Sequence, residues 1–447
     1  MTFGRLLEQL RALAFLLLCA LLFAFPAAAA DNDKVGAALE QMFAAGAVDT
    51  GSEAANARIA ELKEFYAGRS FKPVWVRDDG PKAKGRALLA ELKRSWVQGL
   101  SPKFYNTTEI EALIAATNPA ELARLDALMS GAFIDFAGDL ANGRIGPQVP
   151  GSENQMVRID TNPAAFVEAA AEGGNFPAFA SKYLSADDRY VRLIAKLAEY
   201  DRIGKAGRWP QIDAAAGPIA QGASDPRVPA IRQLLVMAGD LVPDDAGSGD
   251  VFDGALQAGV ASFQERHRLV QDGNLDAATL AEMAVPLSGR LDQMRLNLER
   301  RRWQNVELGP NHLYVNLADA NVRLVLDGET VGFFDIENVP ELAETPTFLA
   351  NATLLGDGML AVEGSPYLDA IGGAGSGKTI EIAKFDTFAE LIRKAKTATP
   401  DAEGKLAAPI SVYVTYVTAW ATSDGKVHFR TDAFGRDPKL AALLYGQ

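Results

Sequence analysis

The spacing of hydrophobic residues changes near residue 311, and this change limits the chain to a fold that joins helical domains to a β domain. Before it, apolar side chains recur every three or four residues, as Leu88, Leu92 and Trp96 do, which is the period of an amphipathic helix. After it, short apolar or alternating runs follow, and Val412–Trp420 is the strongest strand pattern in the chain. The sequence therefore predicts a multidomain α+β protein.

The 447 residues are long enough for about three domains. A helical scaffold is expected over 40–210, followed by a linker rich in Gly, Ala, Pro and Asp over 211–226. A small three-helix unit is expected over 227–287, and a β domain within 290–447.

The β domain is expected to be a truncated antiparallel sheet built from 311–336 and 410–431, each with an Asp-Gly turn signal. Residues 337–380 have no secure pattern, whereas Phe385–Lys396 has a helical one. A charged helix, Leu291–Trp303, precedes the sheet, and its arginines are expected at the surface: Arg295, Arg300, Arg301 and Arg302.

The first thirty residues are typical of a secretory signal peptide. Early arginines precede the apolar run Leu13–Phe25, and small residues suited to a signal peptidase follow. We expect cleavage within this leader, with an uncleaved membrane anchor as the alternative. Cys19 lies inside it and is the only cysteine, so a mature chain from about Asp31 has no thiol and no disulfide.

Composition excludes several classes of function. Lys and Arg total 44 against 57 Asp and Glu, a formal charge of −13, so we expect no nucleic-acid binding. One Cys and three His cannot build a four-cysteine or Cys₂His₂ zinc site, and no His-Glu-x-x-His motif is present. The sequence predicts no metal and no cofactor.

Two motif-like strings suggest chemistry that their context does not support. Gly372–Thr379 matches the phosphate-binding loop pattern, but no buried strand precedes it and too little chain follows, so we expect a Gly/Ser loop and no nucleotide. Ser423, Asp424 and His428 have the residue types of a hydrolase triad, yet they lie in one hairpin, whereas triads are assembled from distant segments.

Motifs in three stretches follow one another in an order known from one family. The first stretch has Phe65-Tyr66, Pro73-Val74-Trp75, Gln98–Pro102 and Gly143-Arg144. The second has Phe263–His267, Asp272-Gly273 and Thr279-Leu280, and the third Leu296–Arg300, Trp303, Val412–Trp420 and Gly435–Asp437. They resemble the scaffold, the type 1 peptidoglycan-binding domain and the YkuD-type catalytic domain of the large, YcbB-type L,D-transpeptidases of Gram-negative cell walls.

The chain departs from this family in the catalytic core. The resemblance implies acyl transfer through a cysteine thiolate in a Ser-His-Gly-Cys motif, but no Cys and no His-Gly pair occur between Trp303 and Gln447. We therefore expect a degenerate, secreted relative with no catalytic residue, which binds peptidoglycan or a cell-wall protein in the periplasm. The alternatives are an active transpeptidase-type enzyme and a decaying gene product.

Wall binding is expected to reside in the three-helix unit. Phe263, His267 and Arg268 lie at one helix end, next to the Asp272-Gly273 turn, where they could line a shallow groove for peptidoglycan. The alternative is that Phe263 belongs to the core and His267 packs on the turn, because apolar stripes at helical spacing are usually core.

Overall fold

The protein forms two compact units, Met1–Arg144 with Ile159–Ala186, and Ile145–Arg158 with Asp187–Gln447. The computed structural model describes residues 33–45, 53–146, 153–156, 158, 162–171, 188–243, 247, 249–304, 308–354, 359–363, 378–383, 386, 388, 390–391 and 410–445. The predicted leader lies outside these residues. None of the described helices is both long and apolar enough to cross a membrane.

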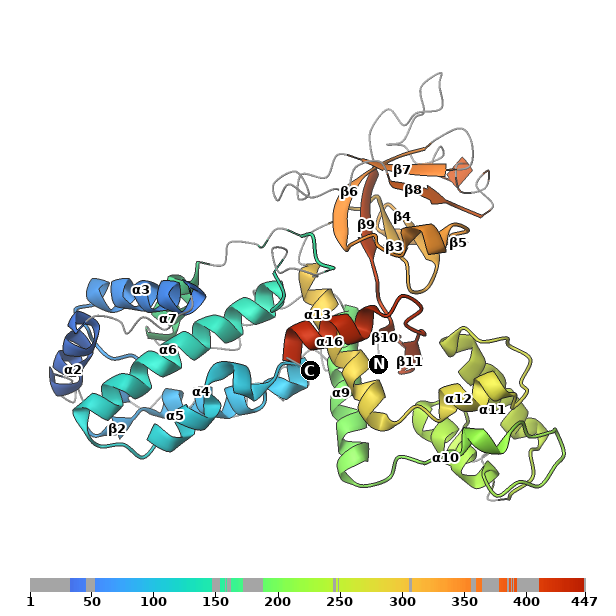
Figure 1. The fold of residues 1–447 in the computed structure, drawn as a ribbon, viewed down its shortest axis with the longest axis horizontal. Coiled ribbons are helices and arrows are strands. Elements are labelled where there is room, and N and C mark those ends of the chain that lie inside the picture. Colours follow the sequence, from blue (N-terminus) through green and yellow to red (C-terminus); the bar gives the residue numbers. More distant parts are fainter. Residues whose placement is uncertain are drawn as a thin grey trace, which may run out of the picture. The chain divides into compact units, whose positions relative to one another are not determined.

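The first unit is helical, as predicted, and is built around α6 (Pro119–Asn142) (Figure 1). The side chain of Asn118 caps this helix by accepting a hydrogen bond from the Ala120 N–H. The apolar stripe of α6 is buried against its neighbours. These neighbours are α2 (Asp33–Ala44), α3 (Glu53–Gly68), α4 (Ala83–Lys93), α5 (Thr107–Leu113) and α7 (Pro163–Ala171).

A buried carboxylate attaches the segment between α3 and α4 to α6. Asp126 of α6 is fully buried and accepts hydrogen bonds from the backbone N–H groups of Val74, Trp75 and Val76, at 3.0, 2.6 and 3.0 Å. The Tyr66 hydroxyl donates a further one at 2.5 Å. Because the carboxylate accepts hydrogen bonds from three consecutive backbone N–H groups, it orders the start of the short hairpin of β1 (Val76–Arg77) and β2 (Gly80–Pro81).

The small three-helix unit consists of α10 (Val228–Ala238), α11 (Gly254–His267) and α12 (Ala277–Met283). Asp253 and Asp276 cap the last two helices through their carboxylates. The predicted linker 211–226 is not an extended connection: it contains the short helix η3 (Ala214–Ala216), and Ile212 and Ile219 are buried in the core of this unit. The segment is folded because the burial of these two apolar side chains completes the core of the three-helix unit.

The second unit is organised by α13 (Leu287–Trp303), which packs against α9 (Asp188–Lys205) and α16 (Arg436–Tyr445) (Figure 1). Three of the four arginines that were expected at the surface are not there: Arg300, Arg301 and Arg302 are at most 3% exposed. Ion pairs explain the burial of Arg300 and Arg302. Arg300 contacts Glu153 and Asp437, each at 2.6 Å. Arg302 contacts Glu299 at 2.8 Å, where both side chains are buried.

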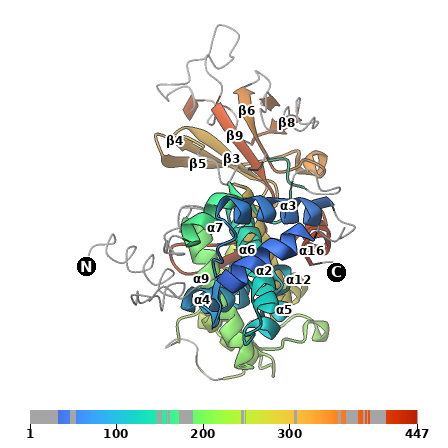
Figure 2. The same ribbon diagram turned by 90° about the vertical axis from the view of Figure 1, so that its left-hand side faces the viewer.

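The sheet has seven strands in the order β5-β4-β3-β9-β6-β7-β8, and Figure 2 shows several of them side by side. The strands are β3 (His312–Asn316), β4 (Asn321–Leu326), β5 (Glu329–Asp335), β6 (Phe348–Leu354), β7 (Met359–Glu363), β8 (Lys378–Glu381) and β9 (Ile410–Thr415). The α+β class is confirmed, but the sheet is mixed rather than antiparallel, because β3 and β9 pair in parallel.

Residues 337–380, which have no secure pattern in the sequence, contribute three of these strands, β6, β7 and the start of β8. Strand β6 pairs in antiparallel with the strongly patterned β9, and β7 and β8 then add to β6 in turn. Neighbouring strands, rather than local propensity, therefore determine this part of the sheet. Most of the predicted helix Phe385–Lys396 lies outside the described residues.

The predicted strand Val412–Trp420 is two strands, β9 and β10 (Ala419–Ala421), with a break between them. The Asn316 side chain accepts the Val417 N–H at 2.8 Å, and the Asn297 side chain accepts the Thr418 N–H at 2.8 Å. These side chains replace a neighbouring strand at the break, so the chain leaves the sheet without losing hydrogen bonds. The Asp-Gly turn then pairs β10 with β11 (Val427–Phe429), as predicted.

The ion pairs of α13 can be tested by removing one partner. Arg300→Met should lower the free energy of unfolding of the second unit by about 3–5 kcal/mol, because it removes the buried cation that pairs with Asp437 and leaves Glu153 with Arg436 as its remaining ion-pair partner. Arg295→Met is the matched control on the same helix: Arg295 pairs with a half-exposed Asp292, so its loss should cost below about 1 kcal/mol. Urea unfolding followed by tryptophan fluorescence measures both, and equal costs would contradict the argument.

Candidate functional site

Two of the three residues predicted to contact peptidoglycan are inside the protein. Phe263 is 2% exposed and belongs to the core of the three-helix unit. His267 stacks on it with ring centroids 3.9 Å apart, and its Nδ1 lies 2.7 Å from Glu282 Oε1. Arg290 of α13 contacts the same carboxylate at 2.7 Å. The two rings are buried and do not line a surface groove. This agrees with the alternative that Phe263 belongs to the core and His267 packs on the turn.

Arg268, the third predicted residue, is partly exposed and points its charge at the β domain. It follows α11 in the left-handed backbone region, with φ of 54°. Its guanidinium lies 3.2 Å from Asp319 and 3.2 Å from Asp335, and 40% of its side chain is exposed. These contacts fasten the end of α11 to the sheet. A contact between Arg268 and peptidoglycan stays a prediction.

Gln264 and Arg266, which also lie on α11, are buried. The Gln264 amide donates to Asp272 and Thr279, and its oxygen accepts the Gly273 N–H at 2.7 Å, so it fixes the Asp-Gly turn. Gly273 has φ of +70°, and a Cβ there would lie 2.8 Å from Gln257, which explains the need for glycine.

Arg266 and Arg430 tie the three-helix unit to the C-terminal hairpin. Arg266 pairs with the fully buried Asp240 at 2.6 Å and donates to the Val427 carbonyl at 2.8 Å. Arg430 donates in return to the carbonyl of Arg266 at 2.6 Å. The unit is therefore held beside β11 by charge-assisted hydrogen bonds that are shielded from water.

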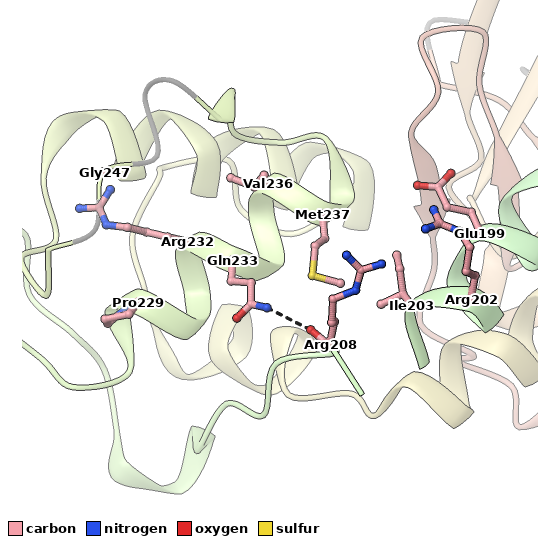
Figure 3. A pocket seen from close by; sticks show the side chains of 10 residues that line it. All are labelled: Glu199, Arg202, Ile203, Arg208, Pro229, Arg232, Gln233, Val236, Met237 and Gly247. Atoms are coloured by element: carbon pink, nitrogen blue, oxygen red, sulfur yellow. Dashed lines mark hydrogen bonds between the residues drawn. The ribbon is translucent and has the colours of Figure 1, made fainter. Parts of the chain in front are cut away.

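A groove of about 600 Å³ lies between α9 and α10 (Figure 3). Figure 3 shows residues of α10 on one side, residues of α9 on the other and Arg208 between them. The lining residues are Glu199, Arg202, Ile203, Arg208, Pro229, Arg232, Gln233, Val236, Met237 and Gly247. Gln233 donates to the Arg208 carbonyl at 3.1 Å, which holds the segment after α9 against α10. Sequence reasoning missed this groove because its two sides were assigned to different domains.

The motif-like strings do not form sites in the described residues. Lys378 and Thr379 start strand β8, whereas the lysine of a phosphate-binding loop starts a helix, and Gly372–Gly377 lie outside the described residues. In the hairpin, Asp424 accepts hydrogen bonds from Thr422 and Lys426, and the His428 ring stacks on Trp420 at 5.2 Å. Within the described ranges, no three His, Cys, Asp or Glu residues are grouped to hold a metal ion.

The imidazoles of the chain are held in their neutral form. Burial, followed by the charge of Arg266, holds the pKa of His267 well below its usual value, although the hydrogen bond with Glu282 acts in the opposite direction. Burial opposes the ionisation of Glu282, yet the hydrogen bond from His267 and the Arg290 charge outweigh it and bring the pKa of Glu282 to about 2. Burial and the Arg430 charge lower the pKa of His428 to about 4.

Comparison with known families identifies two of the domains. Residues 60–197 match the family model described as a scaffold domain, and residues 224–283 match the one described as a putative peptidoglycan binding domain. None of the curated proteins compared with the chain matches it. The two matches confirm the resemblance to the large, YcbB-type L,D-transpeptidases. This is therefore a cell-wall-associated, L,D-transpeptidase-like protein.

The buried imidazole of His267 predicts how stability depends on pH. Its pKa is depressed on folding, so the unfolded chain binds the extra proton and stability falls as the pH drops below about 6.5. His267→Gln should be less stable than wild type at neutral pH. The difference in the free energy of unfolding between wild type and variant should narrow by up to about 1.4 kcal/mol per pH unit below that value. The reason is that the variant has no imidazole that takes up a proton on unfolding. Urea unfolding from pH 7.5 to about 5 measures the gap, and a constant gap would show that His267 does not titrate as a core residue.

Proposed function

We propose that this protein binds peptidoglycan in the periplasm without catalysing transpeptidation. The observation that carries the proposal is a folded peptidoglycan-binding domain next to a sheet that has no thiol, because the only cysteine of the chain is in the predicted leader. The leader also supports the periplasmic location, since such a segment directs export. The scaffold domain supports the same context, since it accompanies wall-processing domains in the family.

The loss of the reaction follows from what acyl transfer requires. The family reaction needs a nucleophile activated by a depressed pKa or by a neighbouring base. Each imidazole of the chain has a structural contact instead: His267 with Glu282, His312 with the Gly309 carbonyl at 2.8 Å, and His428 with the Trp420 ring. Because each imidazole makes a structural contact, these contacts support a binding protein over the alternative of an active transpeptidase.

A second candidate function is binding of a cell-wall protein, favoured by the edge strand β5. This strand ends the sheet on one side, and Phe333 and Val331 expose 67% and 40% of their surface there. An edge strand with exposed apolar side chains can pair with an extended segment of another chain. This function becomes the leading one if the protein does not bind the wall.

The absence of a thiol outside the predicted leader predicts that β-lactams do not acylate the protein. Intact mass should stay at the mass of the polypeptide after incubation with a carbapenem, because no activated thiolate is available to open the ring. An active L,D-transpeptidase treated in parallel is the positive control for acylation. A stable adduct on this protein would restore the enzyme interpretation.

Wall binding predicts that the purified protein co-sediments with isolated sacculi. The bound fraction should decrease only modestly at high salt, because the negative net charge of the chain leaves little long-range attraction to an anionic polymer. A folded protein that stays wholly in the supernatant would exclude peptidoglycan binding and favour the protein-partner function.

A further inference from the structure

We propose that the groove between α9 and α10 is the site where the protein binds the acidic stem peptide of peptidoglycan, with Arg202 and Arg208 contacting its carboxylates. The inference rests on the proposed function and names the part of the polymer that is recognised. It concerns a surface that includes α9, outside the residues matched to the peptidoglycan-binding domain.

The size and walls of the groove suit a short peptide. Its volume of about 600 Å³ lies within the range of ligand sites in proteins. Ile203 on α9 and Val236 and Met237 on α10 give it apolar surface, and the Gln233–Arg208 hydrogen bond joins its two sides (Figure 3). None of the described side chains that line it is aromatic, so these residues offer a sugar ring no flat apolar face to stack on. Peptide is therefore favoured over glycan as the occupant.

The charges in the groove point to an anionic ligand. Arg202 and Arg208 are exposed, and within the described parts of the chain neither guanidinium has an ion pair or a hydrogen bond. Arg232, which also lines the groove, is different: it donates to the Val251 carbonyl and to Asp253 and is buried. Glu199 is paired with Lys196 at 2.8 Å.

Among the described residues, the groove therefore presents two guanidiniums without an ion pair, in a chain with 13 more acidic than basic residues. Guanidinium groups recognise carboxylates through paired N–H donors, and free carboxylates distinguish the stem peptide from the uncharged parts of the polymer. The alternation of small aliphatic side chains and carboxylates along a stem peptide matches a groove that places cations beside Ile203 and Met237. The peptide is therefore complementary to the groove in both charge and polarity.

The test is a calorimetric titration of the full protein with a soluble disaccharide-tetrapeptide that has free carboxylates. Arg202→Gln and Arg208→Gln should each weaken binding about fivefold or more, since one partly exposed ion pair is worth about 1 kcal/mol. Lys205→Gln is the matched control: it removes one positive charge from the same helix, outside the groove, and should bind as wild type does. The same probe with amidated carboxylates should bind wild type more weakly by a similar factor.

Equal affinity of wild type and both arginine variants would overturn the inference, as would equal affinity for the free and amidated probes. The amidated probe uses only the wild-type protein, so a misfolded variant does not leave the question open. If wild type co-sediments with sacculi but does not bind the soluble probe, the groove assignment is wrong while wall binding stands. If it binds neither, the proposed function itself is wrong.

Discussion

The buried ion pairs of α13 are the interaction on which the second unit depends. Arg300 lies between Glu153 and Asp437, and Arg302 lies against Glu299, all with little or no access to water. Charges removed from water are tolerated only with a close partner, so each pair fixes the position of the elements that carry it. The helix thereby holds together residues near 153, near 300 and near 437, which are far apart in the sequence.

This organisation fits the proposal that the protein keeps the architecture of its relatives without their reaction. The ion pairs of α13 and the hydrogen bonds that join Arg266 and Arg430 involve no thiol, so the proposed loss of a catalytic cysteine would leave them intact. The three-helix unit remains fastened to the β domain, and the groove beside α9 remains formed. Binding therefore does not require the chemistry, which makes a wall-binding relative physically reasonable.

Local patterns predicted the α+β class, the helical scaffold and the Asp-Gly hairpin, because each depends on residues close in sequence. They did not predict the burial of Arg300 and Arg302: partners such as Glu153 lie 147 residues away, and a charged run is normally at the surface. Strand β6 was missed because pairing with the distant β9 decides its structure, and β7 and β8 extend the sheet from β6. Arg202 and Arg208 were missed because their groove forms only when two segments assigned to different domains meet.

The central claim is that the protein holds peptidoglycan without forming a bond to it. The most direct test incubates the protein with sacculi and a donor stem peptide, releases it with concentrated urea and measures its mass. The account predicts that the protein sediments with the wall and is recovered in full at the mass of the unmodified polypeptide. Recovery of an acylated protein, or of a fraction that urea cannot release, would contradict it.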